Sequence, residues 1–215
     1  MSLAAKICGL STEAAVSAAV VGGAAFVGFV FYPPSPRAVT ADQAARLCAA
    51  VPTGVARVGL FVDADDDTIR AVLAEAPIDI LQFHGHEGPG RVANAKILFD
   101  RPVMKAVAIA APEDLLDATR YEEVADLLLF DAKPPRRPGA LPGGNGLAFD
   151  WGLIAGRSWH RQWMLSGGLT AELLPEAVRI SGASAVDVSS GIEGRPGEKD
   201  LGKIQAFLAA ARLLG

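Results

Sequence analysis

The sequence contains little cysteine and no excess of positive charge. Cys8 and Cys48 are the two cysteines in 215 residues, and 20 lysine and arginine residues stand against 24 aspartate and glutamate residues, for a formal charge of −4. Two cysteines cannot form a framework of disulfide bonds, and no charged segment leads into an apolar run of the secretory type. Binding to a nucleic-acid backbone requires a basic surface. We therefore expect a cytoplasmic protein with no nucleic-acid partner.

The longest stretch without charge, residues 14–32, is not expected to span a membrane. A transmembrane helix needs about 18 or more consecutive apolar residues, but this stretch is rich in alanine and glycine, and a Gly-Gly pair divides it. Residues 11–21 begin with a Ser-Thr N-cap followed by helix formers, whereas residues 24–31 are aromatic and β-branched. We expect a helix and then a buried strand, and no membrane partner.

Short, nearly continuous apolar segments alternate with helix-like segments along the chain. This order is typical of a parallel sheet that is covered by helices. Eight such units in this length predict an α/β fold, a single (β/α)8 TIM barrel with parallel strands that occupies residues 1–215 as one domain. A doubly wound sheet is the alternative. The expected strands are residues 3–8, 24–31, 56–62, 79–83, 102–109, 126–132, 161–166 and 185–190.

Helices are expected between these strands. Residues 133–147 are rich in proline and glycine, and we interpret them as a loop after the sixth strand, because no linker or low-complexity tract divides the chain. Residues 84–98 are expected to begin as a loop and become helical. The other expected helices are residues 11–21, 40–51, 65–76, 112–124, 170–181 and 200–214.

Several polar side chains fall where the expected strands end. Active sites of TIM barrels lie at the carboxyl ends of the strands, so these residues are expected to meet at one mouth. A thiolate and a carboxylic acid on different strands can remove a proton from one atom and deliver a proton to another, which is what an isomerase requires. The candidates are Cys8, Arg37, His84, Asp131 and Asp187, with Ser189 and Ser190 directly after the last.

Glycine-rich loops follow the last two expected strands. Gly167 and Gly168 lie in LSGGL, and Gly191 lies in SSGIEGRPG before the closing helix. Glycine lets backbone N–H groups approach an anion, and the seventh and eighth loops of barrels often bind phosphate in this way. We expect a phosphorylated small molecule as the ligand, with ordinary glycine turns as the alternative. Residues 142–146 (PGGNG) are a further candidate set of backbone donors.

Two other chemistries have weaker support. The motif HGHE, residues 84–87, offers two histidines and a glutamate, but an H-x-H motif in a loop has no secure third ligand, so no metal site is expected. No hydrolytic triad is visible, because Ser166 lacks the sequence context of a nucleophile elbow.

Seven motifs occur along the chain: KICGL, FYPPSPR, LQFHGHE, FDAK, GGNG followed by FDW, LSGGL, and VDVSSGIEGRPGEKD. In order, spacing and placement at strand ends they resemble the phosphoribosylanthranilate isomerase family of tryptophan biosynthesis, over essentially the whole chain. KICGL combined with the terminal motif is the most specific part of this resemblance. The chain departs from the usual family pattern at Leu173, where asparagine is common, and at Phe83 and Asn145.

The resemblance implies an Amadori rearrangement of N-(5′-phosphoribosyl)anthranilate to its 1-deoxyribulose 5-phosphate form, without a metal or an organic cofactor. It implies that Asp131 is the general acid that protonates the ribose ring oxygen, and that Cys8 is the general base that removes the C2′ proton. Arg37 is expected to contact the anthranilate carboxylate, with His84 and Asp187 as further substrate-binding residues. The expected phosphate-binding residues are Gly144, Gly146, Gly167, Gly168, Ser189, Ser190 and Gly191.

This chemistry makes two electrostatic demands. An ordinary cysteine has a pKa of about 8.5, so Cys8 needs nearby positive charge, such as that of Lys6, to act as a base near neutrality. An ordinary aspartate is ionised at neutral pH, so the surroundings of Asp131 must keep it protonated when substrate is bound.

Other functions stay open as alternatives. A ribulose-phosphate epimerase would need a metal-binding His/Asp set, and the histidine-pathway isomerase would need an aspartate at position 8. A catalytically silent phosphate-binding protein would need neither Cys8 nor Asp131, and both are present. A monomer is expected because no apolar surface helix is obvious, with a dimer as the alternative.

Overall fold

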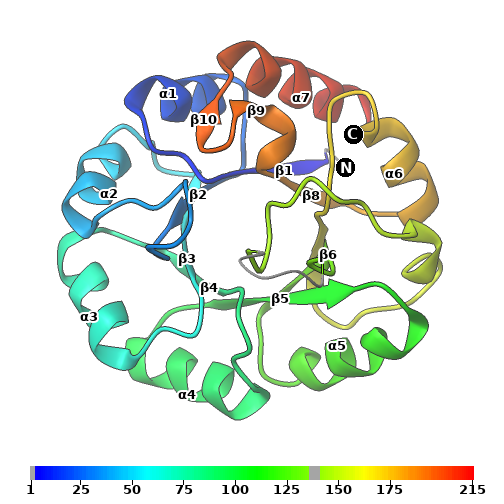
Figure 1. Ribbon diagram of the computed structural model, residues 1–215, viewed down its shortest axis with the longest axis horizontal. Helices are drawn as coiled ribbons and strands as arrows, with labels where there is room; N and C mark the ends of the chain where they lie inside the picture. Colours follow the sequence, from blue (N-terminus) through cyan, green and yellow to red (C-terminus); the bar gives the residue numbers. More distant parts are fainter. Residues whose placement is uncertain (1–2, 136–140) are drawn as a thin grey trace.

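The strands form a closed ring. The computed structural model describes residues 3–135 and 141–215. Within these residues eight parallel strands pair in chain order, and β8 closes onto β1 (Figure 1). The prediction of a TIM barrel is therefore confirmed. The barrel strands are β1 (Ala4–Cys8), β2 (Phe26–Val30), β3 (Ala56–Phe61), β4 (Ile80–Phe83), β5 (Val103–Ile109), β6 (Leu127–Ala132), β7 (Gln162–Leu165) and β8 (Ala185–Val188).

Helices surround the barrel on its outer side (Figure 1). Several begin at a side chain that accepts a backbone N–H from the first turn, as Thr12, Thr40 and Asp65 do. Between β6 and β7 the described residues contain the 3₁₀ helix η2 (Trp151–Leu153) and no α-helix. The α-helices are α1 (Glu13–Val21), α2 (Ala41–Cys48), α3 (Asp66–Glu75), α4 (Pro89–Phe99), α5 (Leu115–Glu122), α6 (Leu174–Ser181) and α7 (Leu201–Leu213), and the 3₁₀ helix η1 (Pro112–Asp114) precedes α5.

The start predicted for α6 was wrong, because the helix begins at Leu174 and not at Thr170. Pro175 has no N–H to donate and suits the first turn of a helix. Before it, the Thr170 hydroxyl accepts the N–H of Leu173 at 3.3 Å and closes a separate turn. This is the N-cap pattern that Thr12 forms at α1, so it supports a first turn, but Pro175 has no N–H to donate to the carbonyl of Ala171 and separates this turn from α6.

The end of the last barrel strand was also placed too late. The predicted strand 185–190 stops at Val188, because Ser189 has φ −131° and ψ −77° and a 3₁₀ helix, η3 (Ser190–Ile192), follows. Only a loop was expected after this strand. The structure instead contains a small antiparallel pair, β9 (Glu193–Arg195) and β10 (Glu198–Lys199).

The uncharged stretch 14–32 is divided between α1 and β2, as expected. No helix in residues 3–135 or 141–215 has the length and apolar character needed to cross a membrane. Of the expected loop 133–147, residues 136–140 lie outside the described residues.

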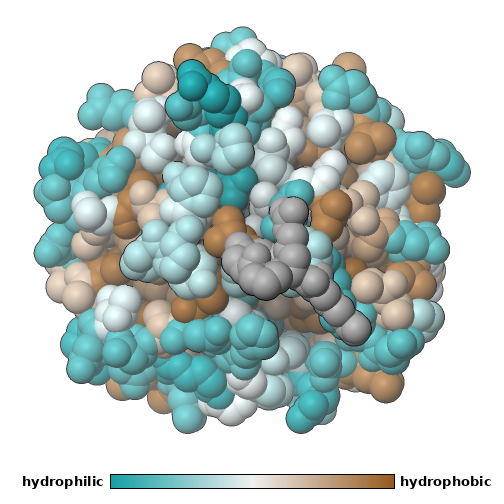
Figure 2. Space-filling view, in the orientation of Figure 1, coloured by the Kyte–Doolittle hydropathy of each residue, from teal (hydrophilic) through white to brown (hydrophobic). Residues whose placement is uncertain are grey.

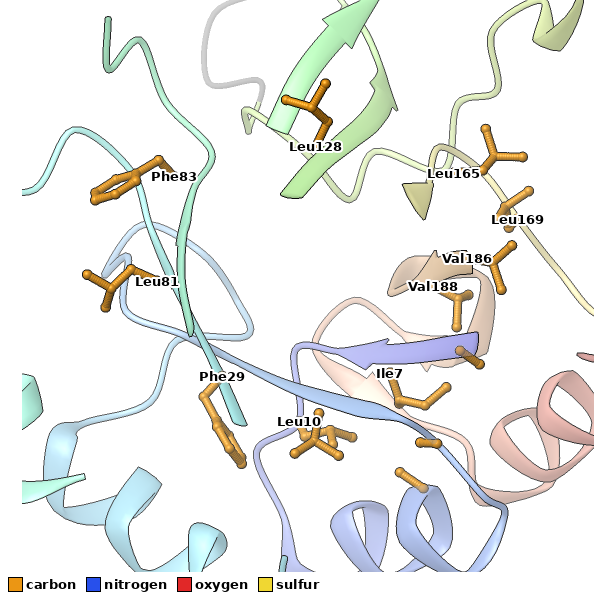
Figure 3. Close-up of a cluster of buried hydrophobic side chains, with 14 of the residues drawn as sticks. Ile7, Leu10, Phe29, Leu81, Phe83, Leu128, Leu165, Leu169, Val186 and Val188 are labelled. Carbon is orange, nitrogen blue, oxygen red and sulfur yellow. The ribbon is translucent and has the colours of Figure 1, made fainter. Parts of the chain in front are cut away.

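The larger core lies between the barrel and the helices. Alternate strand residues point outward, and Figure 3 shows Phe29, Leu81 and Phe83 directed away from the barrel. All three are fully buried, and burying a side chain of this size stabilises the fold by about 1.5–3 kcal/mol relative to exposing it. A slip of one residue would turn these side chains to the other face, so this layer fixes the strand register.

The inside of the barrel changes character along its length. Near the end where the strands begin, Val58, Met104, Leu129 and Met164 pack together in a small apolar cluster. Nearer the carboxyl ends Cys8, Val30 and Leu60 form a second small cluster, and several other inward positions are polar and buried. They include Lys6, Gln82, Asp131, Ser166 and Asp187.

Candidate active site

A pocket opens at the carboxyl ends of the barrel strands, on the face seen in Figure 1. Figure 2 shows the same face, on which hydrophilic and hydrophobic residues are mixed. The empty volume of the pocket is about 760 Å³, including space open to solvent. Every site residue predicted from the sequence lines this pocket: Cys8, Arg37, His84, Asp131, Gly144, Gly146, Gly167, Gly168, Asp187, Ser189, Ser190 and Gly191.

Cys8 is the last residue of β1 and points into the barrel. It is buried, and its register partner on β2 is Gly28. Burial raises the pKa of the Cys8 thiol above its ordinary value, the positive charge of Lys6 acts in the opposite direction, and Asp187 raises it further. A free thiol at this depth is therefore protonated at neutrality unless substrate or a local charge favours the thiolate.

Asp131 belongs to a short hydrogen-bonded chain on the opposite wall. One carboxylate oxygen accepts the N–H of Ala132 at 2.8 Å, and the other lies 3.2 Å from Nε2 of His84. His84 Nδ1 lies 3.0 Å from Nε2 of Gln82. An amide nitrogen at this position donates to Nδ1, which leaves the histidine proton on Nε2, facing Asp131.

The glycines of the β6 loop let the backbone lie directly over these side chains. A Cβ atom at Gly143 would lie 2.5 Å from Nε2 of His84 and 2.8 Å from Asp131 Oδ2, and one at Gly144 would lie 2.5 Å from Nη1 of Arg37. Gly144 also has φ +71°, a conformation that glycine adopts at no steric cost. The GGNG motif is thus a covering segment of the pocket.

Arg37 is held by a partner that the sequence did not reveal. Its Nε and Nη2 donate to the two carboxylate oxygens of Glu193 at 2.7 and 2.9 Å, and Nη2 also donates to the carbonyl of Gly144 at 3.2 Å. Lys199 adds a bond from Nζ to Glu193 at 2.8 Å. Burial would raise the pKa of Glu193, but Arg37 and Lys199 more than offset burial and hold that pKa below its ordinary value.

Asp187 lies at the floor of the pocket, where both of its oxygens are engaged. Lys6 Nζ donates to Oδ1 at 2.8 Å, and the Ser166 hydroxyl donates to Oδ2 at 2.9 Å. Burial would lower the pKa of Lys6, but Asp187 and then Cys8 more than offset it and hold the pKa above its ordinary value. Ser166, considered from the sequence only as a nucleophile, is a hydrogen-bond donor here.

The loops after β7 and β8 require their glycines. Gly167 has φ +88° and Gly168 has φ +64°. A Cβ atom at Gly191 would lie 1.9 Å from the carbonyl oxygen of Leu169, so a side chain cannot be accommodated there without moving backbone. Close backbone approach of this kind is what an anion-binding loop needs.

The residues of the HGHE motif have separate partners. His84 faces Asp131, the imidazole of His86 is almost fully exposed beside Asp63, and Glu87 is buried against Lys105 at 2.9 Å. In the described part of the chain, no group of three or more histidine, cysteine, aspartate or glutamate side chains has the arrangement of a metal site.

Three contributing residues were missed, and two kinds of signal pointed to them. Gln82 is a polar residue at an inward position of an apolar strand, two residues before His84, so strand periodicity alone marks it. Glu193 and Lys199 stand in the VDVSSGIEGRPGEKD motif and pair with each other, but 156 residues separate Glu193 from its other partner, Arg37. Local sequence does not reveal such a pairing.

Comparisons with known proteins agree with one another. The sequence model of the family described as "N-(5'phosphoribosyl)anthranilate (PRA) isomerase" matches residues 5–210. Proteins named N-(5'-phosphoribosyl)anthranilate isomerase are similar to the chain: that of Paracoccus denitrificans is 55% identical over 98% of both chains, and that of Rhodospirillum centenum is 55% identical over 100% of both.

Solved structures are similar over the full length. Phosphoribosyl anthranilate isomerase from Thermotoga maritima superposes with a TM-score of 0.87 at 37% identity, covering 99% of this chain and 100% of that one. A phosphoribosyl anthranilate isomerase in complex with reduced 1-(o-carboxyphenylamino)-1-deoxyribulose 5-phosphate has a TM-score of 0.84 at 34% identity and the same coverage.

Proposed function

The chain belongs to the N-(5′-phosphoribosyl)anthranilate isomerase family, and from this premise we propose that Cys8 and Asp131 are the catalytic base and acid of its reaction. The reaction is the Amadori rearrangement of N-(5′-phosphoribosyl)anthranilate to 1-(2-carboxyphenylamino)-1-deoxyribulose 5-phosphate, a step of tryptophan biosynthesis. One observation carries the assignment of roles: a thiol and a carboxyl group from β1 and β6 line the same pocket at the carboxyl ends of the strands.

The two groups are placed to act on different atoms of one substrate. β7 and β8 separate β6 from β1 in the ring, so the acid and the base face the pocket from different walls. Asp131 protonates the ribose ring oxygen, and the ring opens to a protonated Schiff base. Cys8 then removes the C2′ proton, the C–H electrons form the enolamine, and this tautomerises to the ketone.

His84 supports the acid. Its Nε2 lies 3.2 Å from Oδ2 of Asp131, so its N–H donates to the carboxyl group and holds it in place at the pocket wall. Gln82 orients the imidazole from the other side through Nδ1. We assign His84 a place in substrate binding through this chain, since it also lines the pocket.

Substrate orientation depends on the two ends of the pocket. At one end Arg37 contacts the anthranilate carboxylate. Because Glu193 engages Nε and Nη2, and Gly144 engages Nη2 as well, Nη1 is the nitrogen that donates to the substrate. The carboxylate oxygens of Asp187 retain lone pairs that can accept a hydrogen bond from a hydroxyl group of the ribose chain.

At the other end the phosphate binds to backbone and hydroxyl groups. The positive φ of the glycines and the tight packing at Gly191 support this assignment, since glycine lets backbone N–H groups approach an anion closely. The proposed residues are Gly144, Gly146, Gly167, Gly168, Ser189, Ser190 and Gly191.

We further propose that the protein is a cytoplasmic enzyme with a single barrel domain, residues 1–215, and that it needs no metal or organic cofactor. We propose that the protein is a monomer. A dimer is the alternative, and it is considered because a similar phosphoribosylanthranilate isomerase of Thermotoga maritima is dimeric. Sedimentation velocity at micromolar concentration distinguishes the two.

Loss of the fluorescence of phosphoribosylanthranilate measures the reaction. We expect Cys8→Ala and Asp131→Ala each to reduce kcat by at least about a hundredfold, the lower range for removing a general base or acid, with unchanged circular dichroism. Cys48→Ala is the matched control, because Cys48 is a buried thiol on α2 outside the pocket. A Cys8→Ala enzyme with the wild-type rate would exclude the thiol as the base.

A further inference from the structure

A charged side chain lies inside the barrel directly beneath Cys8. Side chains alternate between the two faces of a strand, so Lys6 and Cys8, two residues apart on β1, both face inward. Lys6 is fully buried, and its register partner on β8 is Asp187. Since an isolated buried ammonium is very unfavourable, Asp187 is the reason that Lys6 stays charged at this depth.

The neighbouring strand brings the lysine and the thiol together. β2 presents Gly28 at this level, and a Cβ atom there would lie 2.9 Å from Sγ of Cys8 and 3.3 Å from Nζ of Lys6. Both groups therefore border the same small space above Gly28. That space exists only because residue 28 has no side chain.

The charges around the thiol have opposing effects. Lys6 on β1 and Lys199 on β10 favour the thiolate, whereas burial and the carboxylate of Asp187 on β8 disfavour it. The neighbouring strand β2 contributes no charge, because it presents Gly28. Without Lys6, Cys8 would face an unpaired Asp187, and thiolate formation would be opposed by a second buried anion.

We propose that Lys6 is a positioning residue for the isomerase reaction, whose ammonium stabilises the Cys8 thiolate while Asp187 limits that stabilisation. The proposal rests on the proposed function in one respect, that Cys8 is the base. The thiol loses its proton to water, and Lys6 stabilises the resulting negative charge. When the thiolate takes the C2′ proton, an S–H bond forms, the C–H electrons enter the enolamine, and the thiol is neutral again.

A purely structural ion pair is the competing explanation, and it differs in what it changes. A structural pair affects the free energy of unfolding but leaves the titration of Cys8 alone. A pair that acts on the thiol moves this titration in opposite directions when either charge is removed, because the two charges have opposite signs.

The test measures the rate of Cys8 alkylation by iodoacetamide against pH, in a Cys48→Ala background so that one thiol is observed. We expect Lys6→Met to move the midpoint of this profile upward by at least about one pH unit, which is about a tenfold slower reaction at a pH below both midpoints. Asp187→Asn should move the midpoint downward. The double variant Lys6→Met/Asp187→Asn should lie between the two and retain more stability than Lys6→Met, since it leaves no unpaired buried charge.

Lys105→Met is the matched control. Lys105 is also a buried lysine in an ion pair, with Glu87, but it points to the outer side of the barrel sheet. The Lys105→Met variant should leave the midpoint of the alkylation profile within about 0.3 pH units of that of the Cys48→Ala parent. A midpoint unmoved in Lys6→Met, or moved in the same direction by Lys6→Met and Asp187→Asn, would overturn the proposal.

Activity supplies an independent reading of the same variants. In Lys6→Met, kcat should fall at neutral pH and recover as the pH rises, with KM changed less than about twofold, because the substrate contacts remain. Alkylation needs no substrate, so the two hypotheses fail separately. An active Cys8→Ala enzyme would reject Cys8 as the base, whereas an unmoved alkylation profile would reject the role of Lys6.

Discussion

Two buried lysines lie on opposite faces of the barrel sheet, and each is paired with a carboxylate. Lys6 faces inward and bonds to Asp187 at 2.8 Å, whereas Lys105 faces outward and bonds to Glu87 at 2.9 Å. The two lysine side chains are 0% and 2% exposed. With chemistry and burial so similar, any difference between the pairs must come from their neighbours.

The neighbours of the outer pair are backbone groups. Lys105 Nζ donates to the carbonyl of Gly85 at 2.7 Å, and Glu87 accepts the N–H groups of Gly85 and Asp63. This pair therefore shapes the loop after β4 that begins with His84. The inner pair has the Cys8 thiol as its neighbour instead. On the proposed role of Lys6, one kind of ion pair builds chain conformation on one face and adjusts chemistry on the other.

The largest effect on stability is expected from breaking the outer pair. Lys105→Met leaves Glu87 buried without its cation and the Gly85 carbonyl without its donor, and breaking such a pair typically costs about 3–5 kcal/mol. Urea unfolding followed by circular dichroism at pH 7.5 measures this loss. The double variant Lys105→Met/Glu87→Gln should recover part of it. If the single and double variants were equally unstable, the unpaired charge would not be the cause.

A smaller effect on stability is expected when a glycine on each face of the barrel sheet is replaced by alanine. Gly28 faces inward and Gly59, on β3, faces outward, where a Cβ atom would lie 3.1 Å from side-chain atoms of Ile78 and Phe61. Adding a methyl group to a packed core costs about 1–3 kcal/mol, so both Gly28→Ala and Gly59→Ala should lower the free energy of unfolding.

Their activities are expected to differ. Gly28→Ala should lower kcat at least about tenfold, because its methyl group occupies the space shared by Cys8 and Lys6, whereas Gly59→Ala should stay within about twofold of the wild type. Steady-state kinetics at a temperature where all proteins are folded provides the comparison. Equal losses of kcat in both variants would contradict the distinction between the faces.

The smallest effect concerns a third pair, Glu193 with Lys199 at the rim of the mouth. The pKa of Glu193 is held below its ordinary value in the folded protein, so its stabilisation is fully present above the unfolded value of about 4.3 and is lost as the pH falls through the lower, folded value. Between pH 7 and pH 3 the wild type should lose about 1–2 kcal/mol more than Glu193→Gln. Thermal unfolding at a series of pH values measures the difference, and parallel curves would show that Glu193 does not contribute to acid sensitivity.

Much of the fold and the site could be predicted from local patterns. The apolar segments before Cys8, His84, Asp131 and Asp187 mark buried strands, and parallel strands of a barrel bring their carboxyl ends to one mouth. The glycines of LSGGL could be recognised as candidate loop residues from their position directly after the strand. The barrel and the position of these residues at one mouth were predictable, because strand length, alternation and glycine conformation are properties of a few neighbouring residues.

The start of α6 and the partner of Arg37 could not be predicted in this way. The helix was predicted from residue 170, but Pro175 has no N–H to donate to the carbonyl of Ala171, and the helix begins at Leu174 after a separate turn. For Arg37, the sequence suggested a contact with the anthranilate carboxylate and no partner within the protein. In the folded protein the guanidinium of Arg37 instead donates two hydrogen bonds to Glu193, which lies in a hairpin after the last barrel strand.

Local sequence is enough to specify a barrel and to bring a thiol, a carboxyl group and glycine loops to its mouth, because periodicity and strand order are properties of short segments. Which charges meet depends instead on the folded chain. Lys6 and Lys105 both lie in β-strands, but strand parity and ring closure bring Lys6 to Asp187, 181 residues away, beside the thiol. Ion pairing depends on distance in space, and in a closed barrel the first strand meets the last.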